Sequence, residues 1–403
     1  MVSERWLAVV GIGEDGIDGL SPAARRLVAQ ATFVVGGRRH LALAGPLNAE
    51  TLVWPSPIES SLDLIEARRG SPSCVLASGD PFFFGVGAML MRRFKADEMI
   101  CVPAPSAFAL AAARLGWSEQ DCAFVSLHGR PLEAIVPHLQ PGARILALSW
   151  DDATPAKLAA LLTARGMGRS KLTICEALGG PSERVRATEA QSFALDNVAA
   201  LNTIALETVV NREARVLPRA AGLPDDWFEH DGQITKREVR AITLGALAPC
   251  RGELLWDVGS GSGSVAIEWM LADPMNGAVA IEARHDRAAR IARNALDFGV
   301  PHLSVVTGEA PKVFADLPSP DAIFIGGGAS ETGLMERART SLAPGGRLVV
   351  NAVTLETQAQ CVEWRARLGG ELVQIAVAHA EPLGRFSGWR AAMPVVQWRL
   401  VKS

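Results

Sequence analysis

Short apolar runs alternate with glycine-containing loops and helix-like segments along most of the chain. In the first half, such runs predict strands at Leu7–Val10, Cys74–Ala77, Met99–Val102, Arg144–Leu148, Leu172–Cys175 and Thr203–Val210. A helix is expected after Ser21-Pro22, since serine is a favoured N-cap and proline fits the first helical position, and a second over Thr154–Ala164. The alternation predicts an α/β layer structure.

The second half repeats this alternation more regularly. Strands are predicted at Leu254–Val258, Ala278–Glu282, Leu303–Thr307, Ala322–Ile325, Arg347–Asn351, Leu372–Ala378 and Val395–Val401. Helices are expected from Ser264 and over Asp286–Phe298, and a capping box at Thr235-Lys236-Arg237-Glu238 predicts another that begins at Ile234-Thr235. This half therefore predicts a doubly wound, Rossmann-like sheet whose ligand lies at the carboxyl ends of its first strands.

The segment Val216–Gln233 has no clear helical or strand period and contains two prolines and two glycines. We interpret it as the join between two domains, because prolines and glycines interrupt regular structure. A length of 403 residues agrees with two or three domains. We predict domains at 1–212 and 222–403, with a linker at 213–221.

Composition and charge exclude several classes of function. Lys and Arg number 40 against 43 Asp and Glu, so the net charge of −3 does not favour nucleic acid as a partner. The most apolar stretch, Val75–Met91, contains Asp80 and Pro81, which argues against a membrane span. The six cysteines form no Cys-x-x-Cys pair and the seven histidines are dispersed, so we expect no metal site and a reducing, cytoplasmic location.

The first glycine loop matches a dinucleotide-binding pattern at Gly11, Gly13 and Gly16. In that pattern the N-terminus of a helix must meet a pyrophosphate, yet the helix cap comes five residues later, at Ser21. Three acidic residues within 14–18 also place negative charge where the pyrophosphate would lie. The loop alone therefore does not predict a dinucleotide site.

The second glycine loop is more informative. The sequence Asp257-Val-Gly259-Ser-Gly261-Ser-Gly263 directly follows a predicted strand, and Glu282 ends the next strand, where an acid can accept both ribose hydroxyls of an adenosine cofactor. A nicotinamide enzyme shares these features but favours glycine at the position of Ser264. The acidic residue before the loop suits a cationic sulfonium, which favours S-adenosylmethionine and leaves NAD as the alternative. The chain contains no Gly-Lys-Ser/Thr sequence, so a P-loop is not predicted.

Three segments of the first half resemble, in the same order along the chain, the three sequence signatures of the tetrapyrrole methylases of corrin and sirohaem synthesis. They are VVGIGEDGIDGLS near the start, ASGDPFFFG at 77–85 and VPAPSAFALAAARLG at 102–116, and the resemblance covers roughly residues 5–212. Relatives often have Pro-Gly-Asp where this chain has Glu14-Asp15-Gly16. The resemblance implies one S-adenosylmethionine site formed by Gly13, Ser78, Gly79, Asp80, Phe83, Ser106 and Ala107.

The second half resembles the decarboxylating precorrin methylase domain, which has the class I methyltransferase fold. The resemblance rests on LPDDWFEHDGQITKREVRA, the loop after Asp257, GEAP at 308–311 and FIGGGAS at 324–330, and covers about residues 222–403. It implies a second S-adenosylmethionine site formed by Thr235, Gly259, Ser260, Gly261, Ser262, Gly263, Glu282 and Ala310.

Together the two resemblances imply a bifunctional enzyme of cobalamin biosynthesis that methylates two meso carbons of a precorrin and releases an acetate carboxyl as carbon dioxide. They assign C-5 to the first half, and C-15 with decarboxylation to the second. Candidate catalytic residues are Asp231, before the capping box, and His379, in the segment 379–390. We expect this segment to form either a lid or substrate wall near the active face or an ordinary long loop. We expect a homo-oligomer with no membrane partner.

Other interpretations of the sequence remain open. They are a methyltransferase acting on a different tetrapyrrole, a nicotinamide-dependent oxidoreductase, and an inactive first half that only supports oligomers. One further pattern is Arg284, Arg287, Arg290 and Arg293, spaced by three on one predicted helix, which we interpret as a solvated face.

Overall fold

The computed structural model describes residues 5–403 and confirms the α/β fold. The chain divides into two compact units. The first runs to Arg215, apart from Glu133–Pro137, which cluster with the second unit, Val216–Ser403. The division falls inside the segment 213–221 that the sequence suggests as a linker.

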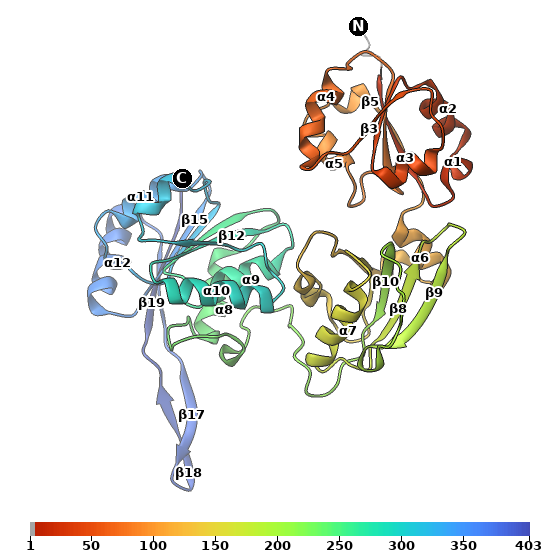
Figure 1. The fold of residues 1–403 in the computed structure, drawn as a ribbon. Helices are drawn as coiled ribbons and strands as arrows, with labels where there is room; N and C mark the ends of the chain where they lie inside the picture. The colour runs from red at the N-terminus through yellow and green to blue at the C-terminus, as the bar shows by residue number, and fades with distance from the viewer. Residues whose placement is uncertain (1–4) are drawn as a thin grey trace. The chain divides into compact units, whose positions relative to one another are not determined.

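The first unit contains two five-stranded sheets (Figure 1). One sheet is parallel throughout and has the order β3-β2-β4-β1-β5. The other has the order β6-β7-β10-β8-β9, in which only β6 and β7 pair in parallel. The strands are β1 Leu7–Ile12, β2 Phe33–Gly36, β3 Glu50–Val53, β4 Ser73–Ser78, β5 Met99–Val102, β6 Cys122–Ser126, β7 Arg144–Leu148, β8 Lys171–Glu176, β9 Arg184–Glu189 and β10 Asn202–Glu207.

The second unit is built on a seven-stranded sheet in the order β13-β12-β11-β14-β15-β19-β16. Its first five strands are parallel and follow the order typical of doubly wound folds, while β19 is antiparallel to both of its neighbours. A separate two-stranded ribbon, β17-β18, extends away from this sheet (Figure 1). The strands are β11 Leu254–Val258, β12 Gly277–Glu282, β13 Ser304–Thr307, β14 Ala322–Ile325, β15 Arg347–Ala352, β16 Glu371–Ile375, β17 Ala378–Leu383, β18 Phe386–Ala391 and β19 Val395–Val401.

Helices cover both faces of the large sheet. A buried cluster on one face joins α11 and α12 to the strands through Leu334, Ala338 and Cys361, and Figure 1 shows α8, α9 and α10 grouped on the other side. The α-helices are α1 Gly16–Gly19, α2 Pro22–Gln30, α3 Arg38–Ala44, α4 Leu62–Glu66, α5 Gly87–Leu90, α6 Ala107–Leu115, α7 Thr154–Ala164, α8 Arg237–Leu247, α9 Ser264–Ala272, α10 His285–Asp297, α11 Leu334–Ser341 and α12 Leu355–Leu368. Short 3₁₀ helices cover Ile58–Ser61, Ala96–Glu98, Glu119–Asp121, Leu132–His138, Ala190–Ser192, Asp225–Trp227 and Lys312–Asp316.

The expected long loop over residues 379–390 is wrong, because this segment forms most of the hairpin β17-β18. Pro382 pairs with Ser387, next to the turn at Leu383↔Phe386. A proline is tolerated here because each strand of a two-stranded ribbon is an edge strand, in which every second backbone N–H points outward.

Within residues 5–403, no helix is long and apolar enough to cross a membrane. Within the same residues, no group of three or more histidine, cysteine or acidic side chains is arranged to hold a metal ion.

Candidate functional site

The glycine loop after β11 adopts a conformation that only glycine accommodates readily. Gly259, Gly261 and Gly263 have φ angles of +71°, +62° and +79°, and Gly263 directly precedes α9. A Cβ atom on Gly259 would lie 3.0 Å from the backbone nitrogen of Gly327, in the loop after β14. The loop thus brings bare backbone to the carboxyl edge of the sheet, where a ligand can approach it closely.

Glu282 lies at the end of β12, beside this loop. Its side chain is buried, and its carboxylate accepts hydrogen bonds from the backbone N–H of Gly261 at 2.9 Å and of Arg284 at 3.0 Å. An ionised carboxylate offers about four lone-pair sites, so both oxygens can accept further hydrogen bonds. The position and remaining acceptor capacity fit the predicted role of binding two ribose hydroxyls.

Asp257, near the end of β11, hydrogen-bonds to the glycine loop and to the first turn of α9. Its Oδ2 atom accepts hydrogen bonds from the Ser260 hydroxyl at 2.7 Å and from the Ala266 N–H at 3.1 Å, while the buried Oδ1 atom has no partner. Burial raises the pKa of Asp257 to about 6, although these two hydrogen bonds lower it, and the neighbouring Glu282 raises it further.

Because the pKa of Asp257 is raised in the folded chain, the unfolding free energy should depend on pH. Below about pH 3 the group is protonated in both the folded and the unfolded chain, whereas near pH 7 ionisation of the buried carboxyl favours the unfolded chain. The wild-type chain should therefore lose about 3 kcal/mol of unfolding free energy relative to Asp257→Asn between about pH 3 and pH 7. Denaturant titrations of both chains across this range measure the difference, and a difference independent of pH would contradict the prediction.

The predicted capping box at Thr235 is wrong, because α8 begins at Arg237 and its N-cap, Lys236, makes no side-chain cap bond. The carbonyl oxygen of Thr235 instead accepts a hydrogen bond from the buried guanidinium of Arg240. The Thr235 hydroxyl is thereby free of a capping role. We call residues 222–235, which lead into this helix, the strap.

One cavity of about 1,280 Å³ opens between the strap, the glycine loop and the base of the hairpin. It exceeds the volume of 300–1,000 Å³ typical of small-molecule sites, so it has room for more than one ligand. Of the residues predicted for the second site, those that line it are Thr235, Gly259, Ser260, Gly261, Glu282, Ala310 and His379.

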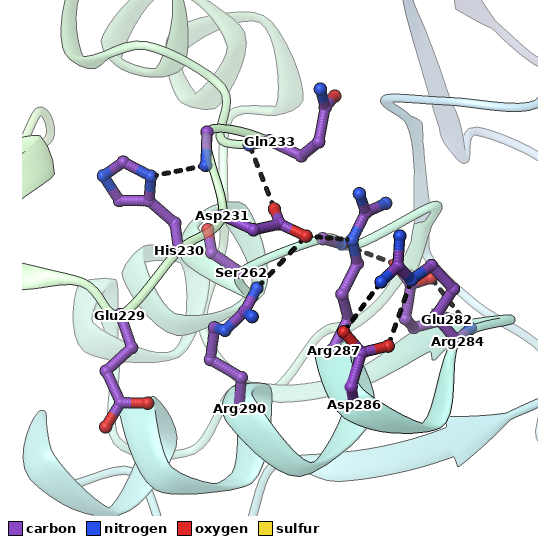
Figure 2. A network of polar contacts seen from close by, with 12 residues as sticks. Glu229, His230, Asp231, Gln233, Ser262, Glu282, Arg284, Asp286, Arg287 and Arg290 are labelled. Carbon is purple, nitrogen blue, oxygen red and sulfur yellow. Dashed lines mark hydrogen bonds and ion pairs between the residues drawn. The ribbon is translucent and has the colours of Figure 1, made fainter.

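The other predicted residues of this half do not line the cavity. Ser262 is buried beneath the loop with a hydroxyl that has no partner, and Gly263 packs towards Ile291 of α10. Asp231 lies in the strap, where its carboxylate pairs with Arg287 and Arg290 (Figure 2). The hydrogen bond from Arg287 holds the pKa of Asp231 far below its usual range, which favours the ionised carboxylate.

His379 lies on β17 and lines the cavity with an exposed imidazole. Its Nε2 atom is 3.9 Å from the Glu238 carboxylate of α8. The imidazole is thus the predicted catalytic group that the structure places where it can reach a bound ligand. The sequence analysis did not assign Arg287 to the site, although Arg287 lines the cavity as well. Its spacing on α10 was visible but suggested a solvated face.

In the first unit, three predicted segments meet at the carboxyl ends of parallel strands. The neighbouring strands β1 and β4 end in register at Ile12 and Ser78, so Gly13 and Gly79 follow side by side. Gly79 has a φ of +52°, and its carbonyl oxygen accepts a hydrogen bond from Ala104 N–H at 3.0 Å. A Cβ on Gly79 would lie 2.9 Å from the Cα of Ser106, so only glycine fits this approach.

The remaining predicted residues build the turn and the helix beside this junction. The Asp80 carboxylate accepts a hydrogen bond from Phe82 N–H at 2.8 Å, which closes the turn after β4. Phe83 packs its ring against Phe108 of α6, with centroids 5.1 Å apart. Ser106 caps α6 through Ala109 N–H at 3.1 Å, and Ala107 is the first residue of that helix.

Sequence reasoning missed two residues beside Ser78. Arg39 donates a hydrogen bond to the Ser78 hydroxyl at 2.8 Å, and His40 Nε2 lies at the same distance from it. Burial lowers the pKa of His40 to about 4, so the imidazole is neutral near pH 7. Arg39 also pairs with Glu14 of the first glycine loop. No local pattern around α3 indicates this arrangement, which depends on the pairing of β2 with β4.

Two family models match the chain. Residues 7–194 match the tetrapyrrole (corrin/porphyrin) methylases, and residues 226–402 match the precorrin methyltransferase domain. The methyltransferases of these families use S-adenosylmethionine as methyl donor.

Curated relatives agree with both matches. A precorrin-6Y C(5,15)-methyltransferase [decarboxylating] of Sinorhizobium sp is 58% identical over 398 residues, which are 98% of this chain and 96% of the relative. A probable cobalt-precorrin-6B C(15)-methyltransferase (decarboxylating) of Pyrobaculum calidifontis is 37% identical over 43% of this chain and 92% of its own length. A cobalt-precorrin-7 C(5)-methyltransferase of Salmonella typhimurium is 34% identical over 44% of this chain and 88% of its own length. The chain therefore belongs to the family of decarboxylating precorrin-6Y C(5,15)-methyltransferases.

Proposed function

We propose that this chain methylates precorrin-6Y at C-5 and C-15 with S-adenosylmethionine and removes the carboxyl of the ring C acetate, giving precorrin-8X. The observation that carries the proposal is the cavity of about 1,280 Å³, which the glycine loop and Glu282 line on one side and His379 on another. One wall suits the nucleoside of the methyl donor, and the volume leaves room for a macrocycle beside it.

We assign C-5 methylation to the first unit, and C-15 methylation with decarboxylation to the second. The C(15) and C(5) relatives are separate proteins, and each aligns with less than half of this chain over most of its own length. Together with the separate family-model matches of residues 7–194 and 226–402, this supports one methyl-donor site in each unit. In the first unit the site would lie at the junction of Gly13, Gly79 and Ser106.

Methyl transfer needs little covalent help from the protein. A meso carbon of a reduced tetrapyrrole is enamine-like and already nucleophilic, so the chain's task is to hold donor and acceptor in line at a near-attack distance. The glycine loop lets backbone approach the donor closely, and Glu282 would fix its ribose. We assign no metal to either step.

Decarboxylation requires an electron sink and a proton. When the bond to the acetate carboxyl breaks, carbon dioxide leaves and the electron pair enters the conjugated macrocycle; the carbon then takes up a proton. We propose His379, which lines the cavity, as the donor of that proton. If a His379→Ala chain released carbon dioxide at the wild-type rate, His379 would have no such role.

Calorimetric titration of the intact chain with S-adenosylhomocysteine tests the number of sites. We expect two sites in the wild-type chain, one site in an Asp80→Ala chain, and no binding of NADH to either. A single site in the wild-type chain that Asp80→Ala leaves unchanged would mean that the first unit binds no methyl donor. Binding of NADH alone would indicate an oxidoreductase.

We also propose that the chain forms a homo-oligomer. The hairpin exposes three large apolar side chains, those of Leu383, Phe386 and Trp389, and exposed apolar clusters of this kind mark association surfaces. Light scattering of the wild-type chain should give a mass above that of one chain, and Trp389→Ser should shift it towards the monomer. A wild-type chain that is monomeric at micromolar concentration would contradict the proposal.

A further inference from the structure

The strap is tied to one face of α10 by a series of side chains. Arg287 and Arg290 pair with Asp231 at 2.9 and 3.5 Å, and Asn294 lies one turn further along the same face. Figure 2 shows the two arginines of α10 reaching the strap carboxylate between them. The side chains of both arginines are largely buried, at 20% and 17% exposed, so this part of the helix is not the solvated face that the sequence suggested.

Asn294 is the most buried member of this series, at 3% exposed. Its Oδ1 atom accepts a hydrogen bond from Glu229 N–H at 2.9 Å, and its Nδ2 group donates to the Glu229 carbonyl at 3.0 Å. The same Nδ2 group donates to the carbonyl oxygen of Ser262 at 2.8 Å. One amide therefore bonds both the strap and the glycine loop.

The strap and the glycine loop are also in direct contact at the cavity. A Cβ atom on Gly261 would lie 3.1 Å from the carbonyl oxygen of Gln233, and both residues line the cavity. Movement of the strap relative to the loop would therefore change the shape of the cavity wall.

We propose that Asn294 is a positioning residue of the methyl-donor site in the second unit: it holds the strap in register with the glycine loop, although it does not itself line the cavity. This inference rests on the proposed function, since it assumes that the cavity binds S-adenosylmethionine. Misplacement of a binding wall by about 1 Å is enough to weaken a site substantially. The pairs of Arg287 and Arg290 with Asp231 form a second tie on the same strap.

A matched residue separates positioning from a general contribution to stability. Asn276 is also buried, at 1% exposed, and its amide likewise bonds three backbone groups, which belong to Gly252, Glu253 and Trp269. None of these four residues lines the cavity. Truncation of either asparagine should thus remove a comparable number of buried hydrogen bonds.

The experiment compares Asn294→Ala with Asn276→Ala in the full-length chain. Both substitutions should lower the melting temperature of the second unit by similar amounts. In titrations with S-adenosylhomocysteine below both melting temperatures, Asn294→Ala should weaken the second-unit site by about tenfold, whereas Asn276→Ala should leave it unchanged. In steady-state assays, Asn294→Ala should raise KM for the methyl donor more than it lowers kcat. If the two substitutions changed the affinity of the second-unit site equally, or if neither changed it, the proposal would be overturned.

Two additions keep the result decisive. If Asn294→Ala does not fold, Asn294→Asp replaces it, because the carboxylate still accepts from Glu229 N–H but cannot donate to Ser262. Amide hydrogen exchange without ligand should be faster in residues 229–233 and 259–263 together in the Asn294 variant, and not in Asn276→Ala. If the wild-type chain has no second-unit site, the proposed function fails, and unchanged exchange in these two segments would then refute the positioning role independently.

Discussion

Replacement of Glu282 by alanine should weaken binding of the methyl donor to the second unit by at least about 100-fold. The carboxylate would accept two charge-assisted hydrogen bonds from the ribose, and each is worth about 1.5–3 kcal/mol. The substitution also frees the Gly261 N–H, which Glu282 holds at 2.9 Å, so the loop loses a support at the same time. Titration with S-adenosylhomocysteine should then detect the first-unit site alone.

A suitable control is Glu253→Ala. Glu253 is a partly buried acid that pairs with Arg347 and accepts a hydrogen bond from Cys250 N–H, but it does not line the cavity. We expect this variant to retain both sites at wild-type affinity. Loss of affinity in Glu282→Ala no larger than in Glu253→Ala would show that Glu282 does not bind the ribose.

Of the proposed substitutions, replacement of Arg240 by methionine should lower the unfolding free energy of the second unit most. The guanidinium is fully buried, donates to Glu268 at 2.6 Å and to Asp225 at 3.0 Å, and also bonds the carbonyl oxygens of Leu223 and Thr235. Removal leaves the buried Glu268 carboxylate without its cation, which typically costs about 3–5 kcal/mol. Scanning calorimetry should show the transition of the second unit at a lower temperature and the transition of the first unit unchanged.

Arg293→Met provides the matched comparison. Arg293 also pairs with a glutamate, Glu229, at 2.8 Å, but both side chains are more than half exposed. Water screens such a pair, so its loss should lower the unfolding free energy much less than the loss of Arg240 does. If the two substitutions lowered the unfolding free energy equally, the Arg240 pair would contribute no more than an exposed one.

Most of the buried strands were predicted from the sequence, because burial on both faces dictates their composition, but the short buried strand β2 was missed. β14 is apolar throughout and β11 is apolar apart from Asp257, and the predicted bounds of both are confirmed. The polar strands β9 and β18 were missed, since their residues are exposed or partly exposed and form no apolar run. Their strand character depends on pairing with partners, which no local window reveals.

Some residues of the candidate site could likewise be identified from the sequence, and others could not. The glycine loop and Glu282 were identifiable, because positive φ angles and an acid at a strand end leave a signal in the sequence. The contributions of Arg287 and Asn294 were not, because they depend on which face of α10 meets a strap that lies more than 50 residues earlier in the chain. A regular spacing of arginines gives the period of a helix face but not what covers that face.

The ribbon β17-β18 has a consequence for the order in which the second unit folds. It continues the pairing of β16 with β19, so residues from Glu371 to Arg399 form one long antiparallel hairpin around the turn at Gly384. Contacts in such a hairpin are local and can zip within about 1–10 µs, whereas parallel strands such as β11 and β14 must first close long loops. The antiparallel edge of the sheet can therefore form early and act as a template on which β15 docks.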